Sequence, residues 1–130
     1  MTDVGVAQRC TRSAAVVQIA GDLDTAVAPL ARTALDRAVA ARPHVVVDLA
    51  EVPTIDPTGL GILVRARQEA RRRHGDLLRA GPSRYVRTVM RTMRLHTAFA
   101  TFDTVQQALT AADAAAGSAA EHEYAAAHRR

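Results

Sequence analysis

The clearest hydrophobic pattern in the chain is a short apolar run at His44–Leu49, followed after a loop by apolar residues at helical spacing. The β-branched residues Val45–Val47 predict a strand that is covered on both faces. Asp56 and Pro57 indicate a helix start, because a carboxylate caps free backbone N–H groups and the first helical turn tolerates proline. The apolar positions of this helix are Leu60, Leu63, Val64 and Ala70. A buried strand therefore leads into a helix that begins beside a hydroxyl residue, Thr58.

Similar patterns predict the remaining elements. Two short strands at 6–10 and 15–20 should form a hairpin around a polar turn. We expect helices at 26–41, 83–93 and 105–116, and further strands at 77–80 and 98–102. The helix at 26–41 is closely linked to the strands at 15–20 and 44–49, which favours a crossover and parallel pairing of these two strands. The predicted fold is a single-domain α/β sandwich, with a mixed sheet of about four or five strands and about four helices that mainly cover one face.

The same patterns predict which helical side chains are buried. In helix 83–93, which Ser83 should cap, the buried stripe comprises Val86, Val89, Met90 and Met93. In the helix after Pro57, which His74 and Gly75 should terminate, Ile62 lies off the buried stripe and is expected to be exposed. An exposed isoleucine beside a hydroxyl residue suits a protein interface, although a lone exposed isoleucine is also common.

The ends of the chain are expected to differ from its centre. Residues 1–5 are predicted to be a loose N-terminus, and residues 6–116 to form the domain. Gly117 and Ser118 are expected to end the last helix, which leaves an alanine-rich, low-complexity tail at 117–130.

The net charge of +4 is distributed unevenly along the sequence. Residues 65–94 carry ten arginines and two acidic residues, a net charge of +8, whereas residues 1–64 and 95–130 each have a net charge of −2. One interpretation is that two helices have solvated arginine faces. Another is that these helices bind an acidic partner surface, since complementary charge favours association. Direct nucleic-acid binding is the weakest interpretation, because only 3% of the residues are aromatic and no nucleic-acid motif is recognisable.

Several classes of chemistry have no support in the sequence. The five histidines lack metal-ligand spacing, and neither a Walker loop nor a dinucleotide-binding glycine pattern is present. The serine residues lack the surroundings of a nucleophile elbow. We therefore expect no enzyme, no metal and no cofactor. The single cysteine, Cys10, excludes an internal disulfide, and no signal peptide or membrane-spanning run is evident, so we expect a cytoplasmic protein without membrane insertion.

Three motifs resemble the STAS domain, the fold of bacterial anti-sigma factor antagonists. Val46–Leu49 followed by Ile55–Gly61 is similar to the family's strand–loop–helix junction, which typically carries Asp-Ser-Ser/Thr-Gly-Leu-Gly. Gly21–Asp24 resembles an early turn of the family, and Ala80–Ser83 resembles a late strand-to-helix turn. The resemblance spans residues 6–112 and implies a STAS-like α/β fold.

The resemblance also implies a phosphorylation switch at Thr58, which falls on the second hydroxyl residue of the family motif. Pro57 stands where the family has the first hydroxyl residue, and this removes a backbone donor and stiffens the loop. The implied partner is an anti-sigma factor with serine/threonine kinase activity. Binding to it releases a sigma factor, phosphorylation ends that binding, and a phosphatase restores it. The expected partner-binding residues are Asp22, Asp24, Asp56, Pro57, Thr58, Gly59, Gly61, Ile62 and Arg65.

Other interpretations of the same residues stay open. Thr58 could be only a first-turn residue, and Asp24 or Thr25 could cap the following helix. A non-switching STAS module, such as a scaffold or an accessory subunit of a larger complex, would contact a partner through Thr58 without modification. A small-ligand or nucleotide sensor is a third class, supported only by the helix start, and nucleotide titration with an Asp56→Asn control would test it.

Overall fold

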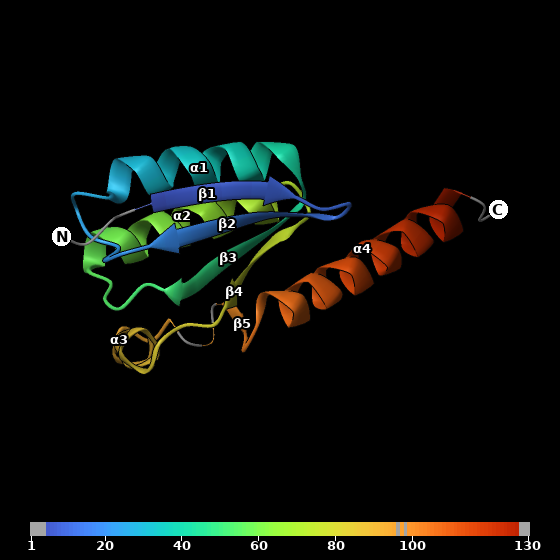
Figure 1. Cartoon of the computed structure of the whole chain (residues 1–130). Coiled ribbons are helices and arrows are strands. Elements are labelled where there is room, and N and C mark those ends of the chain that lie inside the picture. The colour runs from blue at the N-terminus through green and yellow to red at the C-terminus, as the bar shows by residue number, and fades with distance from the viewer. Residues whose placement is uncertain (1–4, 96, 98, 128–130) are drawn as a thin grey trace.

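The computed structural model describes residues 5–95, 97 and 99–127, with side chains as far as Gly117. Figure 1 shows the described chain as a layered domain from which the last helix extends past the sheet. In chain order, the elements of this part of the protein are β1 (Gly5–Cys10), β2 (Ala14–Ala20), α1 (Ala28–Ala41), β3 (His44–Glu51), α2 (Pro57–Arg72), β4 (Asp76–Ala80), α3 (Arg84–Thr92), β5 (Ala100–Phe102) and α4 (Val105–Ala127).

The strands of the described chain form one mixed sheet in the order β1-β2-β3-β4-β5. β1 and β2 are an antiparallel hairpin, whereas β2, β3, β4 and β5 pair in parallel. The predicted parallel pairing of β2 with β3 is confirmed. In the central strand β3, Val46 pairs with Val16 of β2 and with Leu78 of β4. Val45, Val46 and Val47 are all fully buried, so the prediction of a strand covered on both faces is confirmed.

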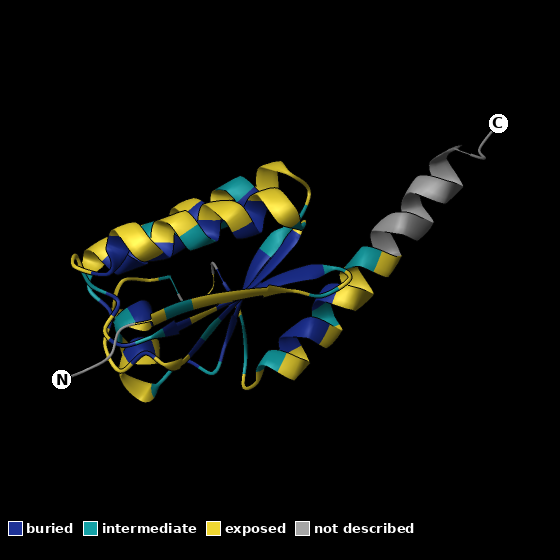
Figure 2. Cartoon of the chain, turned by 45° about the horizontal axis from the view of Figure 1, so that its top comes forward, coloured by how far each residue is buried: buried dark blue, intermediate teal, exposed yellow. Residues whose placement is uncertain are grey.

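Helices cover the two faces of the sheet unequally. α1 and α2 pack on one face against Val45 and Val47, and Met90 of α3 joins the same core. α4 alone packs on the other face, where Leu109 contacts a second core around Val46. Figure 2 shows that the helix sides toward the sheet are buried and the outward sides exposed. The predicted α/β fold is confirmed. The helices were expected to cover mainly one face of the sheet, and α4 is the exception because it packs on the other face.

Two turns predicted from the sequence have a clear structural cause. His74 ends α2 in the left-handed region with φ 65°. A Cβ atom on Gly75 would lie 1.5 Å from the carbonyl oxygen of Pro43, so only glycine fits this close approach. Ser83 caps α3 as predicted, because its Oγ accepts a hydrogen bond from the N–H of Val86 at 3.2 Å.

The predicted burial of Met93 is wrong. α3 ends at Thr92, and Met93 lies at the C-cap with a side chain that is 51% exposed. The chain turns there, and the N–H of Leu95 donates to the carbonyl oxygen of Met90 at 2.8 Å. Because α3 ends one residue before Met93, the side chain of Met93 does not continue the buried stripe of the helix. Leu95 packs against the core instead.

The predicted end of the last helix at Gly117 is also wrong, because α4 continues past that residue. A glycine inside a helix costs about 1 kcal/mol relative to alanine, and the many alanines on both sides outweigh this cost. At the other boundaries, β5 starts at Ala100, and its predicted first residue, Ala98, lies outside the described residues. Gly5 opens β1 rather than belonging to a loose N-terminus, and the rest of that segment, residues 1–4, lies outside the described residues.

Candidate functional site

The candidate site lies where the loop after β2 meets the loop before α2. Leu23 and Ile55 form an isolated parallel bridge between these loops, and both side chains are buried. The N–H of Leu23 donates to the carbonyl oxygen of Thr54 at 2.9 Å, and the N–H of Asp56 donates to the carbonyl oxygen of Leu23 at 3.2 Å. The two loops are therefore fixed to each other, which brings the residues after Leu23 close to Thr58.

Asp56 caps α2 as the sequence predicted. Its backbone is extended, and its Oδ1 accepts a hydrogen bond from the N–H of Gly59 at 2.9 Å. Pro57 occupies the first turn, where its missing N–H leaves no helical hydrogen bond unmade. Thr58 follows with an exposed side chain. This local sequence therefore presents a hydroxyl group to solvent at the N-terminus of a helix.

Gly59 and Gly61 have different places in the site. Gly59 is buried, and a Cβ atom there would lie 2.3 Å from the carbonyl oxygen of Leu23. Gly61 is exposed, and a Cβ atom there would meet no described atom within 4 Å. Gly59 was predicted as a partner-binding residue, but it lies beneath the surface, where it lets α2 begin against the Leu23 loop and so positions Thr58.

The hydroxyl group of Thr58 lies beside that of Thr25 from the neighbouring loop. The Oγ1 atom of Thr25 is 3.4 Å from Oγ1 of Thr58 and 3.5 Å from Oδ2 of Asp56. Strong hydroxyl hydrogen bonds have oxygen–oxygen distances of about 2.7–2.8 Å, so both contacts are weak. The Thr58 hydroxyl is consequently accessible and only loosely held by the protein.

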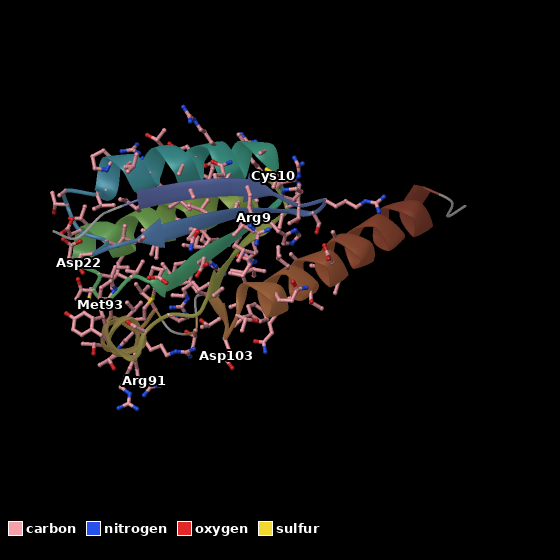
Figure 3. The ribbon with its side chains drawn as sticks, viewed as in Figure 1. Arg9, Cys10, Asp22, Arg91, Met93 and Asp103 are labelled. Atoms are coloured by element: carbon pink, nitrogen blue, oxygen red, sulfur yellow. The ribbon has the colours of Figure 1, made fainter. Side chains whose placement is uncertain are left out.

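Three carboxylates belong to the loops around Thr58. Asp56 contributes one, and Asp22 contributes an exposed one at the end of the domain where β2 terminates (Figure 3). Asp24 is half-buried, and its Oδ1 accepts hydrogen bonds from the N–H groups of Ala26 and Val27 at 3.0 and 3.2 Å. Asp24 therefore stabilises the turn before α1, whereas the N-cap of the helix itself is Val27, without a side-chain hydrogen bond. The three carboxylates together make this side of the site acidic.

A groove of about 170 Å³ runs from Thr58 between α1 and α2. Its lining residues are Arg32, Leu35, Asp36, Thr58, Gly61, Ile62, Arg65 and Ala66. The predicted full exposure of Ile62 is wrong: its side chain is half-buried and packs against the main core, because the adjacent helix α1 shields it. Arg65 is exposed, so the groove has a basic side chain opposite the acidic loops.

The sequence analysis missed three residues of this site. Thr25 was considered only as a helix cap, and no periodicity links it to Thr58, which lies 33 residues further along the chain. Arg32 and Asp36 of α1 were not among the expected partner-binding residues, yet both line the groove. Their four-residue spacing, which places them on one helix face, was the available signal.

The geometry suits modification of Thr58 or its contact with a protein. Among the described residues, no group of three or more histidine, cysteine, aspartate or glutamate side chains could hold a metal ion. Nor does any helix in the described part of the chain combine the length and apolar character needed to cross a membrane. The features that remain are an accessible hydroxyl group, an acidic rim and a groove beside it.

A model of the STAS domain matches residues 6–108, and the chain therefore belongs to the STAS domain family. Members of this family are non-enzymatic, in agreement with the expectation from the sequence. No curated protein matches the chain.

Several solved structures have the same fold. An anti-sigma factor antagonist from Mycobacterium paratuberculosis is 24% identical, with a TM-score of 0.77 over 85% of this chain and 95% of that chain. The anti-sigma factor antagonist SpoIIAA in its unphosphorylated form is 20% identical, with a TM-score of 0.71 over 81% and 93%. A sulfate transporter family protein from Wolinella succinogenes is 23% identical, with a TM-score of 0.69 over 78% and 86%. The architecture is therefore shared by anti-sigma factor antagonists and by a transporter-associated protein.

Proposed function

We propose that this chain is an anti-sigma factor antagonist that binds an anti-sigma factor with serine/threonine kinase activity and thereby releases a sigma factor. Phosphorylation of Thr58 by that partner ends binding, and a phosphatase restores it. The observation that carries the proposal is the exposed, loosely held hydroxyl group of Thr58 at the start of α2. It is supported by the shared fold with SpoIIAA, whose structures include an unphosphorylated and a phosphorylated form.

The electrostatics of the loops explain how one phosphoryl group acts as a switch. Phosphorylation adds a charge of about −1.5 to −2 and three strong hydrogen-bond acceptors. The N-terminus of α2 tolerates that charge, because the helix dipole favours anions there. A partner that had docked against Asp22 and Asp56 would instead meet a doubled negative charge. The modification therefore removes the partner without unfolding the domain.

The proposed contact surface combines the two loops and the groove. Gly59 acts beneath this surface as a positioning residue. The proposal requires a cytoplasmic chain, because the kinase takes its phosphoryl group from ATP. The residues proposed to touch the partner are Asp22, Asp24, Asp56, Pro57, Thr58, Gly61, Ile62 and Arg65.

The test is intact-mass measurement and phosphosite mapping of the protein purified from its own cells, with and without stress. Thr25→Ala is the matched control for Thr58→Ala, because each removes one of two neighbouring threonine hydroxyls. We expect one phosphate in the wild type and in Thr25→Ala, and none in Thr58→Ala. The phosphorylated chain should then bind the kinase at least tenfold more weakly than the unmodified chain. An unmodified Thr58 under every condition would contradict the switch.

A non-switching STAS module is the second candidate function. Two observations favour it: Pro57 stiffens the loop before Thr58, and a sulfate transporter family protein shares the fold. In that case the chain is a constant subunit of a larger complex, and Thr58 contacts the partner without modification. Arg65→Ala should then weaken the complex, while stress should change neither the mass of the chain nor the amount of complex recovered.

A further inference from the structure

Arg79 in β4 is a buried arginine that has no ion-pair partner among the described residues. Its side chain is 3% exposed, its Nη2 donates to the carbonyl oxygen of Phe99 at 3.3 Å, and its guanidinium carbon lies 5.0 Å from the Phe99 ring centroid. Within the described part of the chain, its Nε has no hydrogen-bond partner. Arg67 also lies over Phe99, but its Nε is 3.3 Å from a carboxylate oxygen of Asp76. Arg79 thus differs from Arg67, because no carboxylate among the described residues pairs with it.

Arg79 borders a pocket of about 180 Å³ between α3 and the β4–β5 edge of the sheet. Arg79 and Thr101 are paired in the β4–β5 register, so their side chains lie on the same face of the sheet. From α3, Arg87 completes the polar lining, and Arg91 lies at the outer rim, where it extends toward solvent (Figure 3). Two arginines and a hydroxyl group therefore face one small pocket, with Arg91 at its rim and Met90 as its apolar lining.

The charge around this pocket is poorly balanced. Burial, and then the neighbouring charge of Arg87, lower the pKa of Arg79 to about 10, so the guanidinium group is still charged at neutral pH. The ion pair described beside the pocket joins Arg87 to Asp103 at 3.3 Å, and the two side chains are 46% and 82% exposed. A buried charge without a partner is costly. An anion between the two guanidinium groups would supply acceptors to both and offset their repulsion.

We propose that this pocket binds a small tetrahedral oxyanion, a phosphate or sulfate group, between the guanidinium groups of Arg79 and Arg87. Guanidinium forks match such oxygens in bidentate geometry. The hydroxyl group of Thr101 donates only a long hydrogen bond of 3.4 Å to the carbonyl oxygen of Phe99, and by rotating it would donate to the anion instead. The pocket volume of about 180 Å³ is sufficient for one such anion. The site involves neither Thr58 nor its loops, so it does not depend on the proposed function.

The test is calorimetric titration of the full chain with sodium phosphate and sodium sulfate, with sodium chloride at the same ionic strength as reference. Arg87→Gln is the main variant, because Arg87 is exposed and its loss is compatible with folding. Arg84→Gln is the matched control: it removes the same charge from the same helix, but Arg84 does not line the pocket. Asp103→Asn removes the carboxylate that competes for Arg87. Circular dichroism verifies that each variant is folded.

We expect Arg87→Gln to weaken phosphate binding at least about tenfold, Arg84→Gln to weaken it less than about threefold, and Asp103→Asn to strengthen it. Thr58→Ala should leave phosphate binding unchanged, which separates this site from the switch. Adenosine monophosphate distinguishes a nucleotide phosphate from free phosphate, and we expect it to bind no more tightly than phosphate alone. Equal losses in both arginine variants, or no saturable binding beyond the chloride reference, would overturn the proposal.

Discussion

Gly59 and Gly61 lie two residues apart in α2, yet only Gly59 is fixed by its surroundings. A methyl group on Gly59 would lie 2.3 Å from the carbonyl oxygen of Leu23, a backbone atom held by the loop-to-loop bridge. Gly59→Ala should therefore lower the free energy of unfolding by about 2 kcal/mol or more, as overpacking of a rigid site does. Gly61→Ala should raise it by up to about 1 kcal/mol, because alanine is the better helix former.

Urea unfolding followed by circular dichroism measures both free energies. Both variants replace glycine by alanine in the same helix, so the gain in helix propensity is common to both. The difference between their free energies of unfolding therefore reports the contact at Gly59. Equal effects of the two substitutions would show that the start of α2 does not press against the Leu23 loop.

Asp56 has two separable properties, its capping oxygen and its negative charge. Asp56→Ala removes the acceptor of the Gly59 N–H and should cost about 1 kcal/mol in the free energy of unfolding. Asp56→Asn keeps a side-chain oxygen in the same place and should cost less than about half of that. Thermal and urea unfolding of both variants provide the measurement. A full loss in Asp56→Asn would mean that charge, rather than the cap, stabilises the helix start.

The sequence was sufficient for those residues whose partners are near in the chain. The caps at Asp56 and Ser83 each bond a backbone group three residues away, and the sequence predicted both. The contact of Thr25 with Thr58 depends instead on the bridge between Leu23 and Ile55, which only the folded sheet creates. For the same reason Arg79, which lies between apolar residues in β4, gave no sign in the sequence that a pocket would form beside it.

At the scale of the elements, the C-terminus of α3 shows a conflict between sequence and backbone. Arg94 has φ 58°, in the left-handed region, and the N–H of Leu95 bonds to the carbonyl oxygen of Met90 across it. Glycine adopts this conformation without strain and is the usual residue at such a helix end. The domain therefore tolerates a strained cap rather than losing the turn.

Arg94→Gly should relieve this strain and raise the free energy of unfolding by about 0.5–1 kcal/mol. Arg94→Gln is the control, because it removes the same charge but retains a side chain. Differential scanning calorimetry of the two variants separates the backbone effect from the charge effect. If both substitutions changed the melting temperature equally, the left-handed conformation at Arg94 would not be a source of strain.

The ends of the helices were harder to predict than the helices themselves, because helix propensity, apolar spacing and turn residues favour different end points. Met93 continues the apolar spacing of α3, but the chain turns at Thr92 so that Leu95 fills the core instead. Gly117 has the composition of a helix end, yet its neighbours are almost all alanine, and their propensity carries α4 onward. In both cases the helix itself was predicted correctly. Its end was misplaced because residues a few positions further along the chain determine where the helix stops.

At the scale of the whole molecule, the sheet has two cores of unequal size. The larger lies under α1 and α2, and the smaller is closed by α4 alone. Charge is also divided along the chain, because residues 65–94, which include the second half of α2 and all of α3, have a net charge of +8, whereas residues 1–64 have a net charge of −2. The two proposed sites follow this division: a partner surface at the acidic loops, and an anion pocket among the arginines of α3 and β4.

The smaller core depends on Leu109, which is 9% exposed and packs in the cluster that contains Val46 and Leu78. Aromatic residues are absent from the buried part of this cluster as described, so little else can fill the space that Leu109→Ala would leave. That substitution should lower the free energy of unfolding by about 2–4 kcal/mol. Deletion of residues 118–130 should change it by less than about 1 kcal/mol, because the buried residues of α4 that the structure describes end at Ala112. Urea unfolding of both variants decides whether α4 stabilises the domain through its first turns alone, and a large loss on deletion would extend the domain beyond the predicted boundary at residue 116.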